Sequence, residues 1–133
     1  MKIYRPDKKG FFDIHDHDGI KWIFQLRVGL SHLKSHKKRH NFRDTPSDIC
    51  ECTSNAETSI HYFFHCPFFI NQRQELFQSL NPLMFDKGMR FLDDNSLLEL
   101  LLYGHNEFNF DENRIVIKAT IGYIRKTSRF SQC

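Results

Sequence analysis

Apolar residues follow a helical period in five stretches of the chain, the first of which begins at Ile20. Apolar side chains recur there at spacings of three and four residues, at Ile23, Leu26, Leu30 and Leu33. This spacing lines one face of a helix. Gly29 lies inside the pattern and costs about 1 kcal/mol relative to Ala, so we expect either a kink of the helix or a close approach of another segment there.

Two further helices are predicted on either side of Pro67. Glu57 or Thr58 starts the first, which is rich in aromatic residues. Pro67 disfavours helical geometry at the residue before it and suits the first position of a new helix. The second helix keeps apolar residues at helical spacing until Asn81 and Pro82, where we expect it to end.

The last third of the chain holds two more apolar stretches. Residues 97–102 follow Asp94 and Asn95, either of which can cap the start of a helix. Residues 114–125 fit a strand of period two and also a helix, but no partner strand or hairpin turn is visible nearby. Acidic residues before this stretch and basic residues after it suit the helix dipole. We therefore predict a helix and keep the strand as the alternative.

These patterns predict a small all-α domain, and a chain of 133 residues fits one domain. We divide it into a polar, disordered leader (1–19), a helical metal-binding module (20–81) and a C-terminal helical segment (82–133). No apolar run approaches the roughly 18 residues of a membrane span, and no charged-then-apolar leader precedes a cleavage site. We expect an intracellular protein, cytoplasmic or nuclear, with no membrane partner.

Three of the four cysteines fall between residues 50 and 66, together with two histidines. Zn²⁺ takes thiolate sulfur and imidazole nitrogen in tetrahedral sets of four, and a Cys₃His set leaves no position open for catalysis. The spacing is Cys-x-Cys, eight residues, His, four residues, Cys. We predict one structural zinc ion bound by Cys50, Cys52, His61 and Cys66, with His65 as the substitute for His61.

Other interpretations of the same cysteines stay open at this point. Free cysteines are often buried as small hydrophobic residues. A disulfide would need an oxidising compartment. Cys-x-Cys is also a tighter first pair than the usual Cys-x₂-Cys.

The most basic stretch of the chain lies between His32 and Arg43, with five Lys or Arg, three His and no acidic residue. A one-sided positive charge of this kind favours contact with a polyanion. A run of charges is, however, also typical of a solvated helix face. The cations predicted to contact the phosphates of single-stranded RNA or DNA are Lys34, Lys37, Lys38, Arg39 and Arg43. Tyr62 and Phe68, close to the metal ligands, are predicted to stack on unpaired bases.

Two motifs with catalytic potential are set aside. Phe91-Leu92-Asp93-Asp94 resembles the paired carboxylates of a polymerase palm, but such a pair needs a β-hairpin and a third carboxylate, and a predicted helix follows it here. The His-Asp pairs at 15–18 would need further ligands downstream for metal-dependent hydrolysis, and no second His-Asp pair follows. We predict no catalytic residue and no small-molecule substrate.

A set of residues spread over the middle of the chain resembles a known module. They are Leu26-Arg27-Val28-Gly29-Leu30-Ser31-His32-Leu33, His36, Pro46, Cys50, Cys52, Glu57-Thr58, His61, Cys66-Pro67-Phe68, Arg73 and Leu76. The combination looks like the zinc-binding segment at the C-terminal end of non-LTR retrotransposon reverse transcriptases of the jockey-like kind. The likeness covers roughly residues 22–130 and is strongest over 26–77.

The resemblance implies a nucleic-acid-binding Cys-Cys-His-Cys element that follows a polymerase region. In that family a glycine commonly stands after the second cysteine, where a left-handed turn helps the loop to fold; this chain has Thr53. Because the chain begins at Met1 just upstream of the module, we expect a detached segment without polymerase activity. The alternatives are a zinc-stabilised protein-interaction module and a relic reading frame with no selected role.

Overall fold

The computed structural model describes residues 16–40, 47–89 and 92–130, which form an all-α domain. Within these ranges there is no strand, only a β-bridge between Ile49 and Ala56, so the predicted fold class is confirmed. A π-helical turn η1 (His61–His65) and a 3₁₀ turn η2 (Pro67–Phe69) come directly before the helix that begins at Ile70. The α-helices described are α2 (His17–Val28), α3 (Lys34–Arg39), α4 (Ile70–Asp86), α5 (Asp94–Tyr103) and α6 (Phe110–Thr127).

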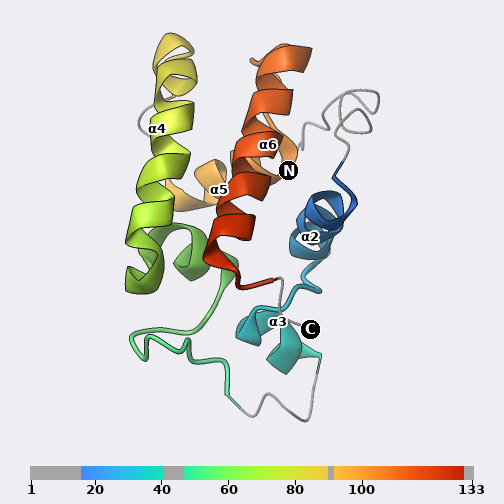
Figure 1. Cartoon of the computed structure of the whole chain (residues 1–133), viewed down its shortest axis with the longest axis vertical. Coiled ribbons are helices and arrows are strands. Elements are labelled where there is room, and N and C mark those ends of the chain that lie inside the picture. The colour runs from blue at the N-terminus through green and yellow to red at the C-terminus, as the bar shows by residue number, and fades with distance from the viewer. Residues whose placement is uncertain (1–15, 41–46, 90–91, 131–133) are drawn as a thin grey trace.

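Helix α6 lies at the centre of the domain and packs against α4, α2 and α5 (Figure 1). Its first turn is closed by a capping box, in which Asn109 and Glu112 each accept a hydrogen bond from the other's backbone N–H. The helix therefore replaces the strand alternative for residues 114–125. None of the described helices is long and apolar enough to cross a membrane. The buried positions of α6 are Asn113, Val116, Ile117, Thr120, Ile121, Tyr123 and Ile124.

Helix α2 begins and ends at residues other than those predicted. The carboxylate of Asp16 caps it by accepting a hydrogen bond from the Gly19 N–H at 2.9 Å, so the helix starts at His17 and residues 16–19 do not belong to a leader. The rest of the predicted leader lies outside the described residues. Gly29 ends the helix in a left-handed conformation with φ of 74°, which corrects the predicted kink. As a result Leu30 leaves the apolar face and is 53% exposed.

Helix α4 continues through Pro82 to Asp86, although we expected it to end at Asn81. A proline inside a helix removes one backbone hydrogen bond and crowds the preceding turn. The helix tolerates this because its inner face stays buried on both sides of Pro82, at Leu80 and Met84. The predicted boundary between 81 and 82 therefore falls inside a continuous helix.

The segment between α3 and α4 contributes to the same hydrophobic core through Tyr62 and Phe63. The Tyr62 ring stacks on Phe130 at a centroid distance of 5.5 Å and meets Tyr123 edge-on at 5.3 Å. The Tyr123 hydroxyl also donates a hydrogen bond to the Tyr62 carbonyl at 2.6 Å. The segment that carries the four predicted ligands, residues 50–66, is thereby held against α6.

Candidate metal centre

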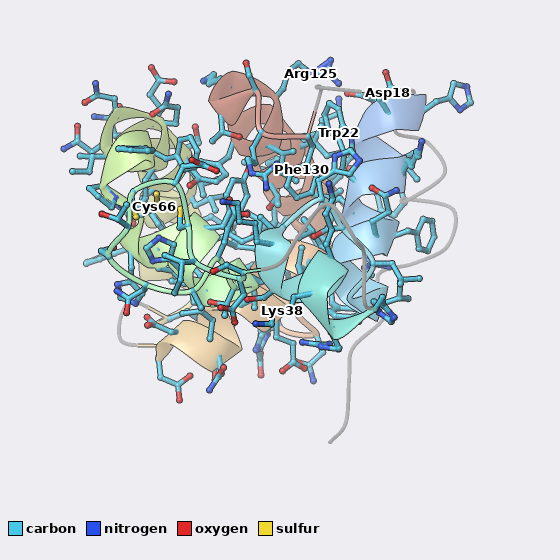
Figure 2. The ribbon with its side chains drawn as sticks, turned by 90° about the horizontal axis from the view of Figure 1, so that it is seen from below. Asp18, Trp22, Lys38, Cys66, Arg125 and Phe130 are labelled. Atoms are coloured by element: carbon cyan, nitrogen blue, oxygen red, sulfur yellow. The ribbon has the colours of Figure 1, made fainter. Side chains whose placement is uncertain are left out.

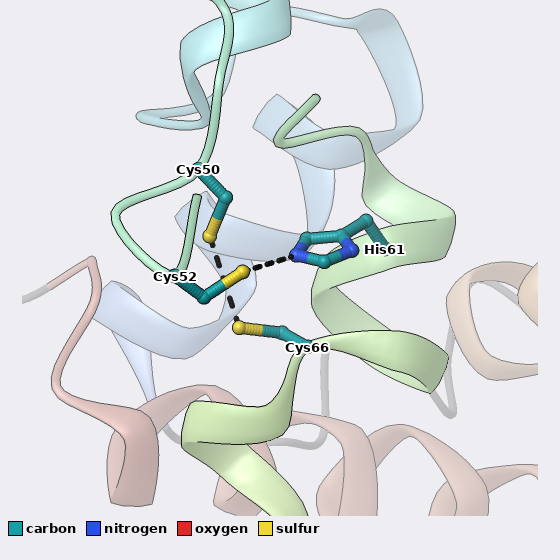
Figure 3. Close-up of side chains that lie close together, drawn as sticks. All are labelled: Cys50, Cys52, His61 and Cys66. Atoms are coloured by element: carbon teal, nitrogen blue, oxygen red, sulfur yellow. Dashed lines mark hydrogen bonds between the residues drawn. The ribbon is translucent and has the colours of Figure 1, made fainter. Parts of the chain in front are cut away.

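A tight turn presents the first two cysteines from a loop. The Thr53 N–H donates to the Cys50 carbonyl at 2.8 Å, and the Cys50 N–H donates to the Asn55 carbonyl at 2.9 Å. Thr53 adopts a positive φ of 66°, a left-handed conformation that glycine takes more readily than threonine. This turn directs the side chains of Cys50 and Cys52 toward the same point (Figure 3).

The other two residues of the cluster lie at the two ends of η1. His61 is its first residue, and Cys66 follows its last. Because Pro67 cannot donate a backbone hydrogen bond and Cys66 is extended, with ψ of 123°, the chain turns away at this point. Arg73 of α4 fixes the turn by donating to the carbonyls of Phe63 at 2.8 Å and Cys66 at 2.7 Å.

The four predicted ligands converge (Figure 3), and their donor atoms all lie within 4.8 Å of one another. The Sγ atoms of Cys50 and Cys66 are 3.7 Å apart, and Cys52 Sγ is 3.2 Å from His61 Nε2. Two thiolates bound to one tetrahedral ion at about 2.3 Å each would be about 3.8 Å apart. The cluster therefore has the donor set and the dimensions to hold one metal ion.

The protonation of the three thiols differs with their surroundings. Burial raises the pKa of Cys50 to about 12 and also raises the pKa of Cys66. A hydrogen bond with the Ser54 hydroxyl, at 3.1 Å, lowers the pKa of Cys52 to about 6. A metal ion that binds here has to displace the protons of the two buried thiols, so its affinity is expected to fall at acidic pH.

His61, and not its substitute His65, belongs to the cluster. His61 is buried, and its Nε2 faces Cys52 while its Nδ1 has no hydrogen-bond partner among the described residues. His65 is half exposed, and its Nε2 instead forms a hydrogen bond with the Asp94 carboxylate at 2.7 Å.

The predicted phosphate-binding cations lie mostly on α3. Lys38 and Arg39 are exposed, and Lys37 is partly buried. Lys34, at the start of α3, forms an ion pair with Glu51 at 2.5 Å. Arg43 lies outside the described residues.

The two aromatic residues predicted to stack on bases have different environments. Phe68 is 58% exposed and is available for such a contact. Tyr62 is 0% exposed, because its ring fills the space between Phe130, Tyr123 and Phe63. The prediction for Tyr62 is therefore wrong, and this residue is part of the core.

Two residues that matter for the cluster were missed from the sequence. Glu57 is a fully buried carboxylate between the second and third ligands, and Arg129 of the C-terminal segment binds it at 2.6 Å. From the sequence, Glu57 was named only as a possible helix start and as part of the resemblance, and was assigned no role at the cluster. No local signal connects it to a residue 72 positions later.

The carboxylates of the polymerase-like motif both have structural contacts. Asp93 caps α5 by accepting from the Ser96 N–H at 2.8 Å, one residue before the cap that we predicted. This hydrogen bond lowers the pKa of Asp93. Asp94 binds His65.

Comparison of the chain with family models, with curated proteins and with solved structures gives no significant match.

Proposed function

We propose that this protein is a single-stranded nucleic-acid-binding module built around one structural zinc ion. The observation that carries the proposal is the convergence of Cys50, Cys52, His61 and Cys66 at the distances of a tetrahedral site. Three thiolates and one imidazole are a donor set that zinc uses in structural sites, with no open position for substrate. The zinc ion would connect the loop that carries Cys50 and Cys52 to the two ends of η1, where His61 and Cys66 lie.

The charge of such a centre places the nucleic-acid contact beside the ion. Zinc with three thiolates carries a formal charge of −1, since +2 and −3 sum to −1, and it repels phosphate by itself. Helix α3, which carries the exposed cations Lys38 and Arg39, supplies the opposite sign. It lies at the same lower end of the molecule as the loop after residue 47 (Figure 1), and Lys38 is labelled on it in the view from below (Figure 2). Phe68, exposed just after the last ligand, supplies a surface on which an unpaired base can stack.

The resemblance to the C-terminal segment of non-LTR retrotransposon reverse transcriptases is part of this proposal. Its support is the ligand spacing, the left-handed turn at Thr53 where that family commonly has glycine, and the role of Arg73 in holding the Cys66 turn. We propose no polymerase activity for this segment, since Asp93 and Asp94 serve as a helix cap and a histidine partner.

The zinc site is tested by metal content. We expect one zinc ion per wild-type chain and loss of zinc in Cys52→Ser and His61→Ala. His65→Ala is the matched control and keeps its zinc, because His65 lies outside the cluster. Structural zinc contributes about 10–16 kcal/mol of apparent binding free energy in finger peptides, so chelation should unfold the loop. A metal-free wild type that stays folded in chelator contradicts the proposal.

The nucleic-acid contact is tested by titrating single-stranded RNA and DNA at several salt concentrations. Each phosphate neutralised on a single strand contributes about −0.7 to the log–log salt slope. Removing Lys37, Lys38 and Arg39 together should therefore weaken binding and reduce the slope by up to about 2. The matched control removes three exposed lysines of the α4 and α6 region: Lys87, Lys118 and Lys126.

Equal loss of affinity in both triple variants would show attraction by net charge alone and would contradict a site on α3. Binding that is unchanged in the α3 variant would favour the protein-interaction module. The exposed apolar residues close to the ligands in sequence, Ile49, Phe68 and Ile70, are the observation that supports this second function.

A further inference from the structure

Glu57 is a buried carboxylate whose backbone belongs to the metal-ligand loop. It lies between Cys52 and His61 in sequence, and only 1% of it is exposed. Its N–H donates to the Asp48 carbonyl at 2.6 Å, next to the bridge between Ile49 and Ala56. The position of this carboxylate therefore depends on the same loop that presents the first two cysteines.

The Glu57 side chain binds the C-terminal segment through Arg129. The guanidinium donates from Nε to one carboxylate oxygen at 2.8 Å and from Nη2 to the other at 2.6 Å. The same Nη2 also donates to the carbonyl of His32, just before α3, at 2.9 Å. A charged pair of this kind is costly to break, because removing one partner leaves the other buried and unpaired.

Glu57 also caps the start of α3. This helix has only six residues, and the residue at its N-cap position, Leu33, provides no side-chain hydrogen bond. Glu57 Oε1 accepts from the Lys34 N–H at 2.8 Å, and the Glu57 carbonyl accepts from the Ser35 N–H at 3.3 Å. A helix this short is unstable on its own, and a carboxylate at its N-terminus is favourable for the helix dipole.

We propose that Glu57 couples metal binding to the order of the basic helix α3. The metal ion closes the loop, the loop places the Glu57 carboxylate, and the carboxylate with Arg129 holds the first turn of α3. The metal thereby controls the presentation of Lys37, Lys38 and Arg39, none of which belongs to the metal cluster. This inference rests on the proposed function and names the means by which its metal centre and its phosphate-binding helix act together.

Glu51 provides a matched control for Glu57. Both acids lie in the loop that carries Cys50 and Cys52, and both contact Lys34. Glu51, however, is exposed, and its carboxylate contacts the Lys34 ammonium group and not the backbone N–H that Glu57 binds. The substitutions Glu57→Gln and Glu51→Gln remove the same charge from the same loop. By electrostatics alone, both should strengthen the binding of a polyanion. Only Glu57→Gln should make the first turn of α3 less ordered.

Amide hydrogen exchange measures the order of α3 directly. The probes are the N–H groups of Lys37 and His40, which donate to the carbonyls of Leu33 at 3.0 Å and His36 at 3.3 Å. In the wild type, removal of zinc with EDTA should speed their exchange by about tenfold or more. With zinc bound, Glu57→Gln should show the same fast exchange, whereas Glu51→Gln should exchange like the wild type. The coupling is overturned if EDTA does not change the amide exchange rates in α3, or if these rates are equal in Glu57→Gln and Glu51→Gln.

Binding to a single-stranded RNA oligonucleotide supplies the second readout. If α3 is ordered in only about one molecule in ten, the apparent Kd rises about tenfold. We therefore expect weaker binding for zinc-loaded Glu57→Gln and equal or tighter binding for Glu51→Gln. Tighter binding in both variants would be a charge effect and would overturn the coupling.

Arg129→Lys repeats the test if Glu57→Gln does not fold. It keeps the positive charge but loses the paired hydrogen bonds to the carboxylate, so α3 should again exchange fast while zinc stays bound. The outcomes also separate this inference from the proposed function. Zinc uptake with coupled exchange but no RNA binding overturns only the proposed function. If the protein takes up zinc and binds RNA, but amide exchange in α3 does not respond to zinc removal, only the coupling is overturned. A chain that binds no zinc overturns both proposals.

Discussion

His36 shows how one buried residue within the basic stretch has a purely structural role. Its Nδ1 accepts a hydrogen bond from the Ser31 N–H at 3.2 Å and lies 2.7 Å from the Ser31 hydroxyl. Because Nδ1 acts as an acceptor, the imidazole is neutral in the folded protein. Burial, followed by the nearby charge of Arg39, lowers the pKa of His36.

This lowered pKa makes stability depend on pH. The unfolded chain takes up a proton on His36 below about pH 6.5, whereas the folded protein does so only at lower pH. The stabilisation from neutral His36 is therefore complete above that pH and is lost as the pH falls toward the folded pKa. We expect urea unfolding to show a larger loss of stability from about pH 7 to 5.5 in wild type than in His36→Gln. The four residues of the metal cluster and the carboxylates are common to both proteins, so equal losses would contradict this role.

At the scale of elements, the contact between α2 and α6 depends on a close approach at Gly19. A Cβ atom at this position would lie 2.4 Å from Ile121 Cγ2 and 3.0 Å from the Asp16 carboxylate carbon. Ile121 is itself buried, so it has little room to move. Gly122 of α6 offers the opposite case, since no heavy atom would lie within 4 Å of an added Cβ.

The two glycines should respond to alanine with opposite signs. We expect Gly19→Ala to lower the free energy of unfolding by about 1–3 kcal/mol through overpacking. Gly122→Ala should raise it by up to about 1 kcal/mol, because alanine favours the helix. Urea unfolding at one zinc concentration measures both. Stabilisation by Gly19→Ala would show that the two helices have space between them.

At the scale of the whole molecule, the segment of residues 50–66 shares one hydrophobic core with the helices α2, α4, α5 and α6. Tyr62 and Phe63 lie between the third and fourth ligands and pack against Tyr123 of α6. Helix α4 also continues across the boundary that was predicted between 81 and 82. The domain should therefore unfold as a unit.

Trp22, the only tryptophan of the chain, allows this to be measured. It is buried in α2, whereas far-UV circular dichroism reports all of the helices. We expect the two signals to change at the same urea concentration, and EDTA to shift both midpoints downward together. If part of the dichroism outlasts the Trp22 transition, the common core is not cooperative.

The sequence alone was sufficient for the fold class, the helical choice for residues 114–125 and the set of four residues that converge and could hold a metal ion. Helical period is a property of neighbouring residues, and ligand type and spacing follow from what zinc binds.

Only the tertiary structure decided which of several suitable residues takes each role. His61 rather than His65 faces the cysteines, Tyr62 is buried rather than exposed, and α4 passes through Pro82. Each of these outcomes depends on what packs against the residue from a distant part of the chain. The pair of Glu57 and Arg129 is the clearest case. Local spacing carries no information on a buried charge pair between distant segments, because only the packed fold brings the two side chains together and excludes water from them.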